Sequence, residues 1–253
     1  MHAARRAGAF LRANLGSATR IDYKGSPTNL VTDMDRRAEA LIVETLRTRY
    51  PDHSILTEEA GVLPGRTTYH WVIDPLDGTT NYAHGVPIYA VSIALEAEGV
   101  PVLGVIYDPS RDECFVAERG GGSSLNGRPI HISGTLSLCE SVLATGFAYT
   151  IRAPRHTNLA EHEALSLRCR AIREIGSAAL SLAAVAAGRF DGFWELRLGP
   201  WDVAAGALLV EEAGGRVTDL AGGPLDRRAP APVASNGHVH GEILDTLKEV
   251  QAR

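Results

Sequence analysis

The segment 74–79, with the sequence Asp-Pro-Leu-Asp-Gly-Thr, carries the strongest chemical signal in this chain. Proline fixes its own φ and restrains the residue before it, so the segment predicts a stiff turn. Such a turn can aim the carboxylates of Asp74 and Asp77, and the Leu76 carbonyl between them, into one small volume. Hard divalent cations such as Mg²⁺ prefer oxygen ligands of this kind. The spacing therefore favours a metal site.

A phosphate site is predicted directly after these aspartates. Gly78 and Thr79 can open a helix, and the free N–H groups and positive dipole end of a helix start favour a phosphate. Metal carboxylates beside a phosphate cradle suggest metal-assisted phosphoryl transfer. An Asp-Pro-x-Asp-Gly string is also a good turn for purely local reasons, so the segment alone leaves both interpretations open.

Other acidic residues favour the metal interpretation by their placement. Glu58 and Glu59 end one short predicted strand, and Asp74 follows another. Acidic residues at strand ends in an α/β-type sheet tend to meet at a crevice. Asp202 starts a predicted helix, where an acid is also a routine first-turn residue. A Glu-Glu pair opening a loop is, taken by itself, more often solvated surface.

Asp35 lies in the segment Thr32–Asp35, which is typical of a capping box at a helix start. Capping explains it on local grounds. The alternative role is to orient a hydroxyl that activates water, and Thr79 is the partner that this role would need.

The elements that must position these residues follow from periodicity and turn signals. Helices are expected over 3–15 and 32–50, and strands over 53–57, 71–73, 88–96, 101–107 and 113–118, with a hairpin turn at Asn126-Gly127. From about 140 the pattern alternates, with strands over 141–147, 171–174, 190–196, 215–219 and 232–235. Helices are expected over 158–168, 177–187, 201–213 and 239–252. The fold class is therefore α/β (α+β), with a layered helix–sheet arrangement.

Two regions of one compact catalytic unit are expected. Residues 1–138 would hold a helix pair, an antiparallel sheet and most metal ligands. Residues 139–253 would form an α/β region that carries Asp202 and substrate-contacting residues, with the site in the crevice between them.

Composition places the chain among ordinary globular proteins. It has 253 residues, 45% apolar and 22% charged, with a formal net charge of −5 and no long basic run. A nucleic acid is therefore not expected as the main partner. Three widely spaced cysteines, no C-x-x-C motif and no signal peptide favour a reducing cytoplasm. The longest apolar stretch is too short to span a membrane.

With these motifs in view, the chain resembles the inositol monophosphatase family of Mg²⁺-dependent, lithium-sensitive phosphatases, whose superfamily includes fructose-1,6-bisphosphatase. The likeness covers essentially the whole chain, and the segments that carry it are 24–27, 29–32, 55–59, 71–82, 176–179, 201–206 and 212–215. The resemblance implies a layered αβαβα sandwich and an inositol-phosphate phosphatase activity. Thr80-Asn81-Tyr82 and the short loop 60–69 favour the inositol branch over relatives that act on nucleotide bisphosphates.

The resemblance also implies roles for individual residues. Two or three Mg²⁺ ions would be held by Glu58, Asp74, the Leu76 carbonyl, Asp77 and Asp202. Asp35 and Thr79, with Glu58, would activate the attacking water. The phosphate and the substrate would be bound by Asp77, Gly78, Thr79, Thr80, Gly176, Ser177, Ala178 through its backbone, Glu195 and Asp202. Lys24 falls where the family has a lysine near the active site.

The substrate stays open at this point. Inositol monophosphate or a similar polyol or sugar phosphate is expected. The alternatives are the same chemistry on fructose 1,6-bisphosphate, histidinol phosphate or 3′-phosphoadenosine 5′-phosphate, because related folds overlap in their motifs. An alternative of another class is a binding or regulatory partner that has kept the fold. A homodimer is expected from the resemblance. Segment 148–162 contains Arg152, Arg155 and His156. It either contacts the substrate, contacts a partner chain, or is ordinary solvent-exposed surface.

Overall fold

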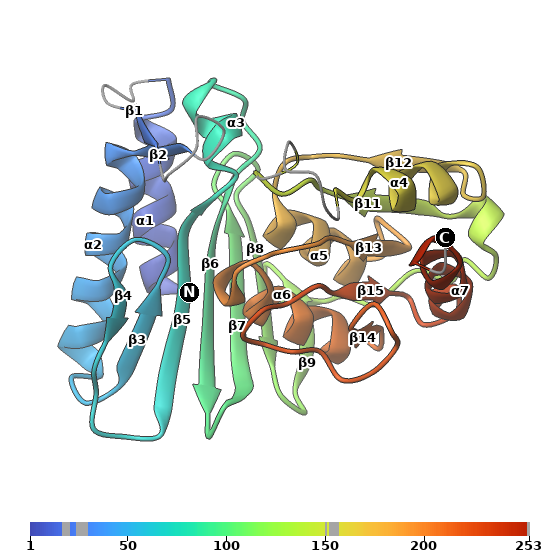
Figure 1. Cartoon of the computed structure of the whole chain (residues 1–253). Coiled ribbons are helices and arrows are strands. Elements are labelled where there is room, and N and C mark those ends of the chain that lie inside the picture. Colours follow the sequence, from blue (N-terminus) through green and yellow to red (C-terminus); the bar gives the residue numbers. More distant parts are fainter. Residues whose placement is uncertain (17–20, 24–29, 150, 152–156, 252–253) are drawn as a thin grey trace.

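The computed structural model describes residues 1–16, 21–23, 30–149, 151 and 157–251, and these form five layers (Figure 1). Two helices, α1 (His2–Ala13) and α2 (Asp33–Arg49), cover one face of an eight-stranded sheet. Two further helices, α5 (Ala178–Ala186) and α6 (Pro200–Glu212), separate this sheet from a five-stranded sheet. Helices α4 (Leu159–Ser166) and α7 (His240–Gln251) lie on the far side of that second sheet. The predicted αβαβα order is confirmed.

The outer helix pair forms for reasons visible in the sequence. Ala3, Ala7 and Leu11 recur at helical spacing on α1 and are buried against α2 and the sheet. Helix α2 begins at Thr32, whose hydroxyl accepts a hydrogen bond from the Met34 amide at 3.1 Å. Its N3 residue, Asp35, accepts in return from the Thr32 amide at 2.8 Å, as the capping box predicts.

The eight-stranded sheet has the order β10-β9-β8-β7-β6-β5-β3-β4. Its strands are β3 (Ser54–Thr57), β4 (Gly61–Leu63), β5 (Tyr69–Asp77), β6 (Ala90–Ala97), β7 (Val100–Asp108), β8 (Glu113–Glu118), β9 (Gly122–Leu125) and β10 (Arg128–Pro129). Most neighbours are antiparallel, but β3 and β5 run parallel, so the prediction of an antiparallel sheet was wrong for this pair. The hairpin at Asn126-Gly127 is confirmed, with φ of 49° and 78° at the two residues.

The middle helices, α5 (Ala178–Ala186) and α6 (Pro200–Glu212), are apolar all round because both sheets cover them. Small residues let them pack closely. A Cβ on Gly206 would lie 2.5 Å from the Leu182 side chain, and one on Gly104 of β7 would lie 2.8 Å from the Ala205 carbonyl oxygen. These contacts hold the middle of α6 against α5 and against the large sheet.

The five-stranded sheet has the order β12-β11-β13-β15-β14 and is mixed. Its strands are β11 (Val142–Thr145), β12 (Ala171–Arg173), β13 (Gly192–Trp194), β14 (Arg216–Thr218) and β15 (Val233–Ser235). Helices α4 (Leu159–Ser166) and α7 (His240–Gln251) and the short 3₁₀ helix η1 (Leu138–Glu140) complete this side. The chain passes from one sheet to the other between Pro129 and Val142, and the division into 1–138 and 139–253 stays a prediction.

Two further differences from the expected elements were found. The short strands β1 (Ile21–Tyr23), β2 (Leu30–Thr32) and β4 were not predicted. Asp74 to Asp77 do not form a free-standing turn, because β5 continues through them with an irregularity in its pairing to β6. Helix α3 (Thr79–Ala83) follows at once, as expected. Among the described residues, no helix is long and apolar enough to cross a membrane.

Candidate functional site

Parallel pairing brings Glu58 beside Asp74. Strands β3 and β5 are in register with Thr57 opposite Ile73, and Glu58 and Asp74 are the next residue of each chain segment. Parallel strands end at the same edge of a sheet, so consecutive residues at that edge are neighbours. Two acids that are sixteen positions apart in sequence therefore reach one place.

The irregular end of β5 turns its two aspartates to the same space. Asp74 lies opposite Ser92 and Asp77 opposite Ala90, so the segment between them holds one residue more than its partner. Such a bulge locally redirects side chains. Gly78 then takes φ of 91°, and a Cβ there would lie 3.0 Å from the Ile88 carbonyl oxygen, which explains the glycine after the second aspartate.

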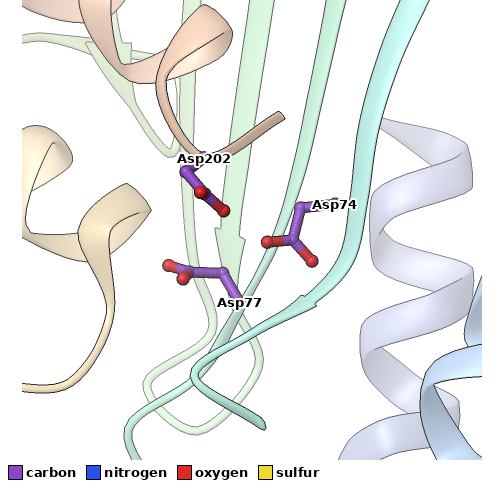
Figure 2. Close-up of side chains that lie close together, drawn as sticks. All are labelled: Asp74, Asp77 and Asp202. Atoms are coloured by element: carbon purple, nitrogen blue, oxygen red, sulfur yellow. The ribbon is translucent and has the colours of Figure 1, made fainter. Parts of the chain in front are cut away.

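The start of helix α6 places a third aspartate, from the other half of the chain, beside Asp74 and Asp77. Asp202 is its N3 residue and accepts a hydrogen bond from the Gly199 amide at 2.6 Å. The Ser92 hydroxyl, opposite Asp74, donates to the Trp201 carbonyl at 3.2 Å and ties this helix start to the sheet. One carboxylate oxygen each from Asp74, Asp77 and Asp202 lies within 4.8 Å of the others, and Figure 2 shows the three side chains pointing toward one another.

The electrostatics of this cluster are unfavourable without a cation. Burial raises the pKa of Asp74 well above its ordinary value, and the charges of Glu58, Asp77 and Asp202 raise it further. Burial likewise raises the pKa of Asp202, with the charges of Asp77 and Glu58 adding to it. The pKa of Asp77 is raised to about 6 by burial. Like charges held this close disfavour ionisation.

A divalent cation suits this donor set. All the facing atoms are oxygens, which Mg²⁺ prefers, and positive charge would relieve the repulsion that raises these pKa values. Glu58 and the Leu76 backbone line the same pocket. The group of three carboxylates is therefore a candidate metal centre.

Asp35 and Thr79 are joined by a hydrogen bond, as the sequence predicts. The Thr79 hydroxyl lies 3.0 Å from Asp35 Oδ1 and 3.0 Å from the Leu76 carbonyl oxygen, and both are acceptors for its proton. The other oxygen of Asp35 accepts from the Thr32 hydroxyl at 2.6 Å. Burial raises the pKa of Asp35, and these hydrogen bonds act in the opposite direction.

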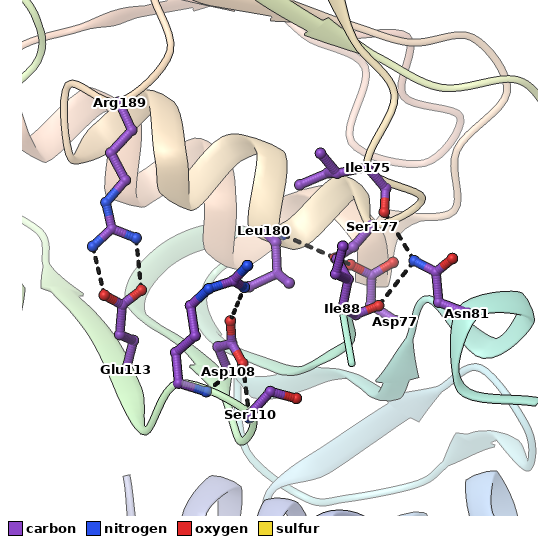
Figure 3. A network of polar contacts seen from close by, with 11 residues as sticks. Asp77, Asn81, Ile88, Asp108, Ser110, Glu113, Ile175, Ser177, Leu180 and Arg189 are labelled. Atoms are coloured by element: carbon purple, nitrogen blue, oxygen red, sulfur yellow. Dashed lines mark hydrogen bonds and ion pairs between the residues drawn. The ribbon is translucent and has the colours of Figure 1, made fainter. Parts of the chain in front are cut away.

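The two halves of the chain are bonded to each other at Asp77. Its Oδ2 accepts from the Ser177 hydroxyl (Figure 3) and, at 2.8 Å, from the Ala179 amide at the start of α5. The Asn81 amide donates to the carbonyls of Ile88 at 2.9 Å and Ile175 at 2.8 Å. These bonds fix the end of β5 against α5.

Glu195 lies at the far wall of the pocket. It follows β13 and is 9% exposed, and burial raises its pKa well above the ordinary value, with the charges of Asp202 and Asp77 adding to it. Gly146 makes room for its carboxylate, because a Cβ there would lie 2.5 Å from both carboxylate oxygens. The glycine at this point therefore leaves the space that the Glu195 carboxylate occupies.

The pocket has a volume of about 300 Å³ and combines predicted and unpredicted residues. Those predicted are Glu58, Asp74, Leu76, Asp77, Gly78, Thr79, Thr80, Gly176, Ser177, Ala178, Glu195 and Asp202. Asp35 lies behind Thr79, and Lys24 is outside the described residues. Those missed are Asn81, Thr145, Gly146, Phe147, Ala148, Tyr149, Glu174, Arg197 and Leu198.

Part of the missed wall was predictable by the strand-end rule that relates Glu58 to Asp74. Strands β11 and β13 are also parallel, with Thr145 opposite Trp194, so Gly146 and Glu195 are the next pair. Segment 148–162 contributes Ala148 and Tyr149 to the pocket. Its Arg152, Arg155 and His156 lie outside the described residues.

Comparison with known proteins agrees with this geometry. A family model described as the inositol monophosphatase family matches residues 1–252. The inositol-1-monophosphatase of Synechocystis sp. is 45% identical over 243 residues, which cover 95% of this chain and 84% of the relative. The Nus factor SuhB of Escherichia coli K12 is 44% identical over 252 residues, which cover 98% of this chain and 94% of the relative.

A solved structure gives the same result for the fold. The inositol monophosphatase from Anabaena (Nostoc) sp. PCC 7120 superposes with a TM-score of 0.90 at 44% identity, covering 98% of this chain and 93% of that chain. The sandwich of this family type, expected from sequence, is confirmed.

Proposed function

The chain belongs to the inositol monophosphatase family, and we propose that it is a Mg²⁺-dependent phosphomonoesterase that hydrolyses inositol monophosphate or a similar polyol phosphate. One observation carries the proposal. Carboxylates from distant parts of the chain, Asp74, Asp77 and Asp202, converge within 4.8 Å beside a pocket large enough for a sugar-sized ester. The relatives named inositol-1-monophosphatase support the choice of substrate class.

The ligands for two or three Mg²⁺ ions are proposed to be Glu58, Asp74, the Leu76 carbonyl, Asp77 and Asp202. Bound Mg²⁺ supplies positive charge to the phosphate oxygens and lowers the pKa of a coordinated water. Asp74 would be suited to contact two cations, because its carboxylate offers two oxygens and the charges of Glu58, Asp77 and Asp202 all act on it. Asp77 is held rigidly for its task, since Ser177 and the Ala179 amide fix one of its oxygens.

Asp35 and Thr79 are proposed to orient the attacking water. When the Thr79 hydroxyl donates its hydrogen bond to Asp35, its oxygen has only lone pairs left to offer, so it accepts a hydrogen bond from the water. The water then directs its own lone pair away from Thr79 and toward the phosphorus. Glu58, which also lines the pocket, is the second group proposed to contact this water.

The remaining pocket residues are proposed to bind the ester. The backbone at Gly78, Thr79 and Thr80 starts α3, where the first N–H groups have no partner within the helix. Glu195, beside Gly146, faces the hydroxyl groups of the alcohol part, together with Asp77, Asp202 and the backbone at 176–178.

Phosphate release from a substrate panel tests the proposal. Inositol monophosphate should be hydrolysed with Mg²⁺ and not after chelation, and Li⁺ should inhibit by occupying a cation position. Faster turnover of fructose 1,6-bisphosphate, histidinol phosphate or 3′-phosphoadenosine 5′-phosphate would change the assigned substrate and leave the proposed reaction, metal-dependent ester hydrolysis, in place. Absence of Mg²⁺-dependent phosphate release from every ester would reject the enzyme proposal.

A second candidate function is a binding or regulatory role, and it rests on one finding. A relative that is 44% identical bears the name Nus factor SuhB, which is not the name of an enzyme. The acid set of the pocket favours catalysis in this chain. Inactivity on the whole panel, together with specific capture by transcription proteins, would favour the second candidate.

A homodimer and a cytoplasmic location complete the proposal. The dimer is taken from the family, and sedimentation at micromolar concentration would test it. Three free cysteines, Cys114, Cys139 and Cys169, suit a reducing compartment, which cell fractionation would check.

A further inference from the structure

The turn that carries Glu58 lies at a weakly supported place in the fold. Residues 58–60 connect β3 to β4, and β4 is a three-residue strand at the edge of the eight-stranded sheet. Within the hairpin, Thr57 pairs with Gly61, and the Thr57 hydroxyl accepts from the Ala60 amide at 3.1 Å. Edge strands are held from one side only. A contact from outside the hairpin therefore has a large influence on the direction of Glu58.

Glu39 of α2 provides that outside contact. Its Oε2 accepts a hydrogen bond from the Glu59 amide at 3.1 Å, across twenty positions of sequence. The Glu39 side chain is 7% exposed, although a glutamate on a helix of this length usually faces solvent. Burial raises its pKa, while hydrogen bonds from the Thr57 hydroxyl and the amides of Glu59 and Ala60 act in the opposite direction. A buried carboxylate is thus directed at the turn.

Helix α2 links this contact to the other side of the site. Asp35 and Glu39 are four residues apart, so they lie on one face of the helix. Asp35 bonds Thr79, beside the aspartates of β5, and Glu39 bonds the turn of Glu58. One rigid helix therefore contacts both arms of the proposed metal centre.

We propose that Glu39 is a positioning residue, whose buried carboxylate holds the turn 58–60 so that Glu58 faces Asp74, Asp77 and Asp202. The inference rests on the proposed metal role of Glu58. Groups that orient metal ligands from behind are usually costly to remove, with losses of about 10–100-fold in metal affinity. Glu39 does not contact the ion or the substrate, so its effect should appear in cation binding before it appears in turnover at saturating Mg²⁺.

Equilibrium Mg²⁺ binding to the resting protein, measured by calorimetry without substrate, tests the proposal. Glu39→Met keeps the length of the side chain and removes both acceptor oxygens. It should weaken Mg²⁺ binding by about tenfold or more. Glu39→Gln keeps one acceptor oxygen and should recover part of the affinity, and kcat at saturating Mg²⁺ should change less than the affinity does.

Two control variants on the same helix separate positioning from general loosening. Leu46→Ala opens a cavity in the core beneath α2, far along the helix from the turn, and should lower the melting temperature while leaving Mg²⁺ affinity unchanged. Glu44→Ala removes an exposed acid of α2 that pairs with Arg6. It should change neither the melting temperature nor the Mg²⁺ affinity. Equal weakening of Mg²⁺ binding by Leu46→Ala and Glu39→Met would overturn the inference.

The remaining outcomes also test the proposed role of Glu39. Parent-like Mg²⁺ affinity in Glu39→Met would overturn the role of Glu39 while leaving the proposed function intact. A parent protein that binds no Mg²⁺ would instead reject the proposed function. If Glu39→Met does not fold, Glu39→Gln decides, because it cannot satisfy all the donors and should bind Mg²⁺ measurably more weakly than the parent.

Discussion

Two pockets beside α5 both contain buried or half-buried carboxylates, but the charged groups next to those carboxylates differ. In the pocket of about 270 Å³ behind α5, Arg189 holds Glu113 through two bonds of 2.6 Å, and Arg111 bonds Asp108 at 2.7 Å. In the site pocket, Asp74 has Glu58, Asp77 and Asp202 as its charged neighbours.

The pKa values follow this contrast. The guanidinium of Arg189 lowers the pKa of Glu113, whereas burial and neighbouring acids raise the pKa of Asp74 and Asp202. A carboxylate paired by arginine stabilises the fold at neutral pH. A group of carboxylates that repel one another costs stability, and such a cost is typical of a site built for a ligand of opposite charge. The same residue type thus serves structure in one pocket and, as we propose, chemistry in the other.

The largest effect is expected from a substitution in the site pocket itself. Asp77→Asn removes a proposed cation ligand and should lower kcat/KM for inositol monophosphate by more than about a hundredfold, since even indirect ligand partners cost about 10–100-fold in metal affinity. The fold should persist, because the amide oxygen can still accept from Ser177 and the Ala179 amide. Steady-state kinetics and circular dichroism check both parts. Mg²⁺-dependent turnover near the parent level would remove Asp77 from the metal set.

The second prediction concerns pH and metal together. Folded Asp77 keeps its proton to about pH 6, whereas an aspartate with the ordinary pKa of 3.8 loses it earlier. The folded metal-free protein therefore binds more protons in this range, so its free energy of unfolding should fall as pH rises from about 4 through 6.

Mg²⁺ should cancel that loss, because it favours the ionised carboxylates. Thermal melts at several pH values, with chelator and with Mg²⁺, measure the difference. We expect Mg²⁺ to raise the melting temperature at neutral pH by roughly 5 °C, since each kcal/mol shifts a protein of this size by about 2–4 °C. A melting temperature of the metal-free protein that stays constant with pH would count against the raised pKa of Asp77.

A smaller effect is expected at the substrate wall. Gly146→Ala places a Cβ where the Glu195 carboxylate lies, so that carboxylate must move. Selectivity among polyol phosphates should change by about tenfold in kcat/KM, in line with misplacement of a polar group that orients substrate. Mg²⁺ affinity should be retained. Glu195→Gln should change selectivity in the same way, and an unchanged substrate profile in both variants would exclude this wall from recognition.

The smallest effect is expected in the arginine-paired pocket. Glu113→Gln removes the charge of Glu113 and one of the two oxygens that accept from Arg189, and it should cost at most about 1 kcal/mol of unfolding free energy, because the pair is partly exposed. Mg²⁺ affinity and turnover should stay at the parent level. Chemical denaturation and steady-state kinetics on the same preparation would measure stability and turnover for comparison with Asp77→Asn. An equal loss of turnover in both variants would contradict the different roles proposed for the two pockets.

The sequence predicted which residues form the site better than it predicted the backbone conformation that positions them. Asp74, Asp77, Asp202 and Glu58 were predictable because acids near strand ends and helix starts are strong local signals, and the resemblance joined them. The bulged end of β5 was not, since it depends on pairing of Asp74 with Ser92 and Asp77 with Ala90. Gly146 was missed because its importance lies in the absence of a side chain, which becomes visible only when Glu195 is placed.

Metal-soaked crystals provide the most direct test of the central claim, that distant acids form one cation site. Mn²⁺ can replace Mg²⁺ at oxygen ligands and is located by its anomalous scattering. We expect anomalous peaks in contact with the carboxylates of Asp74, Asp77 and Asp202. Peaks only elsewhere on the protein, or none at saturating Mn²⁺, would contradict the claim.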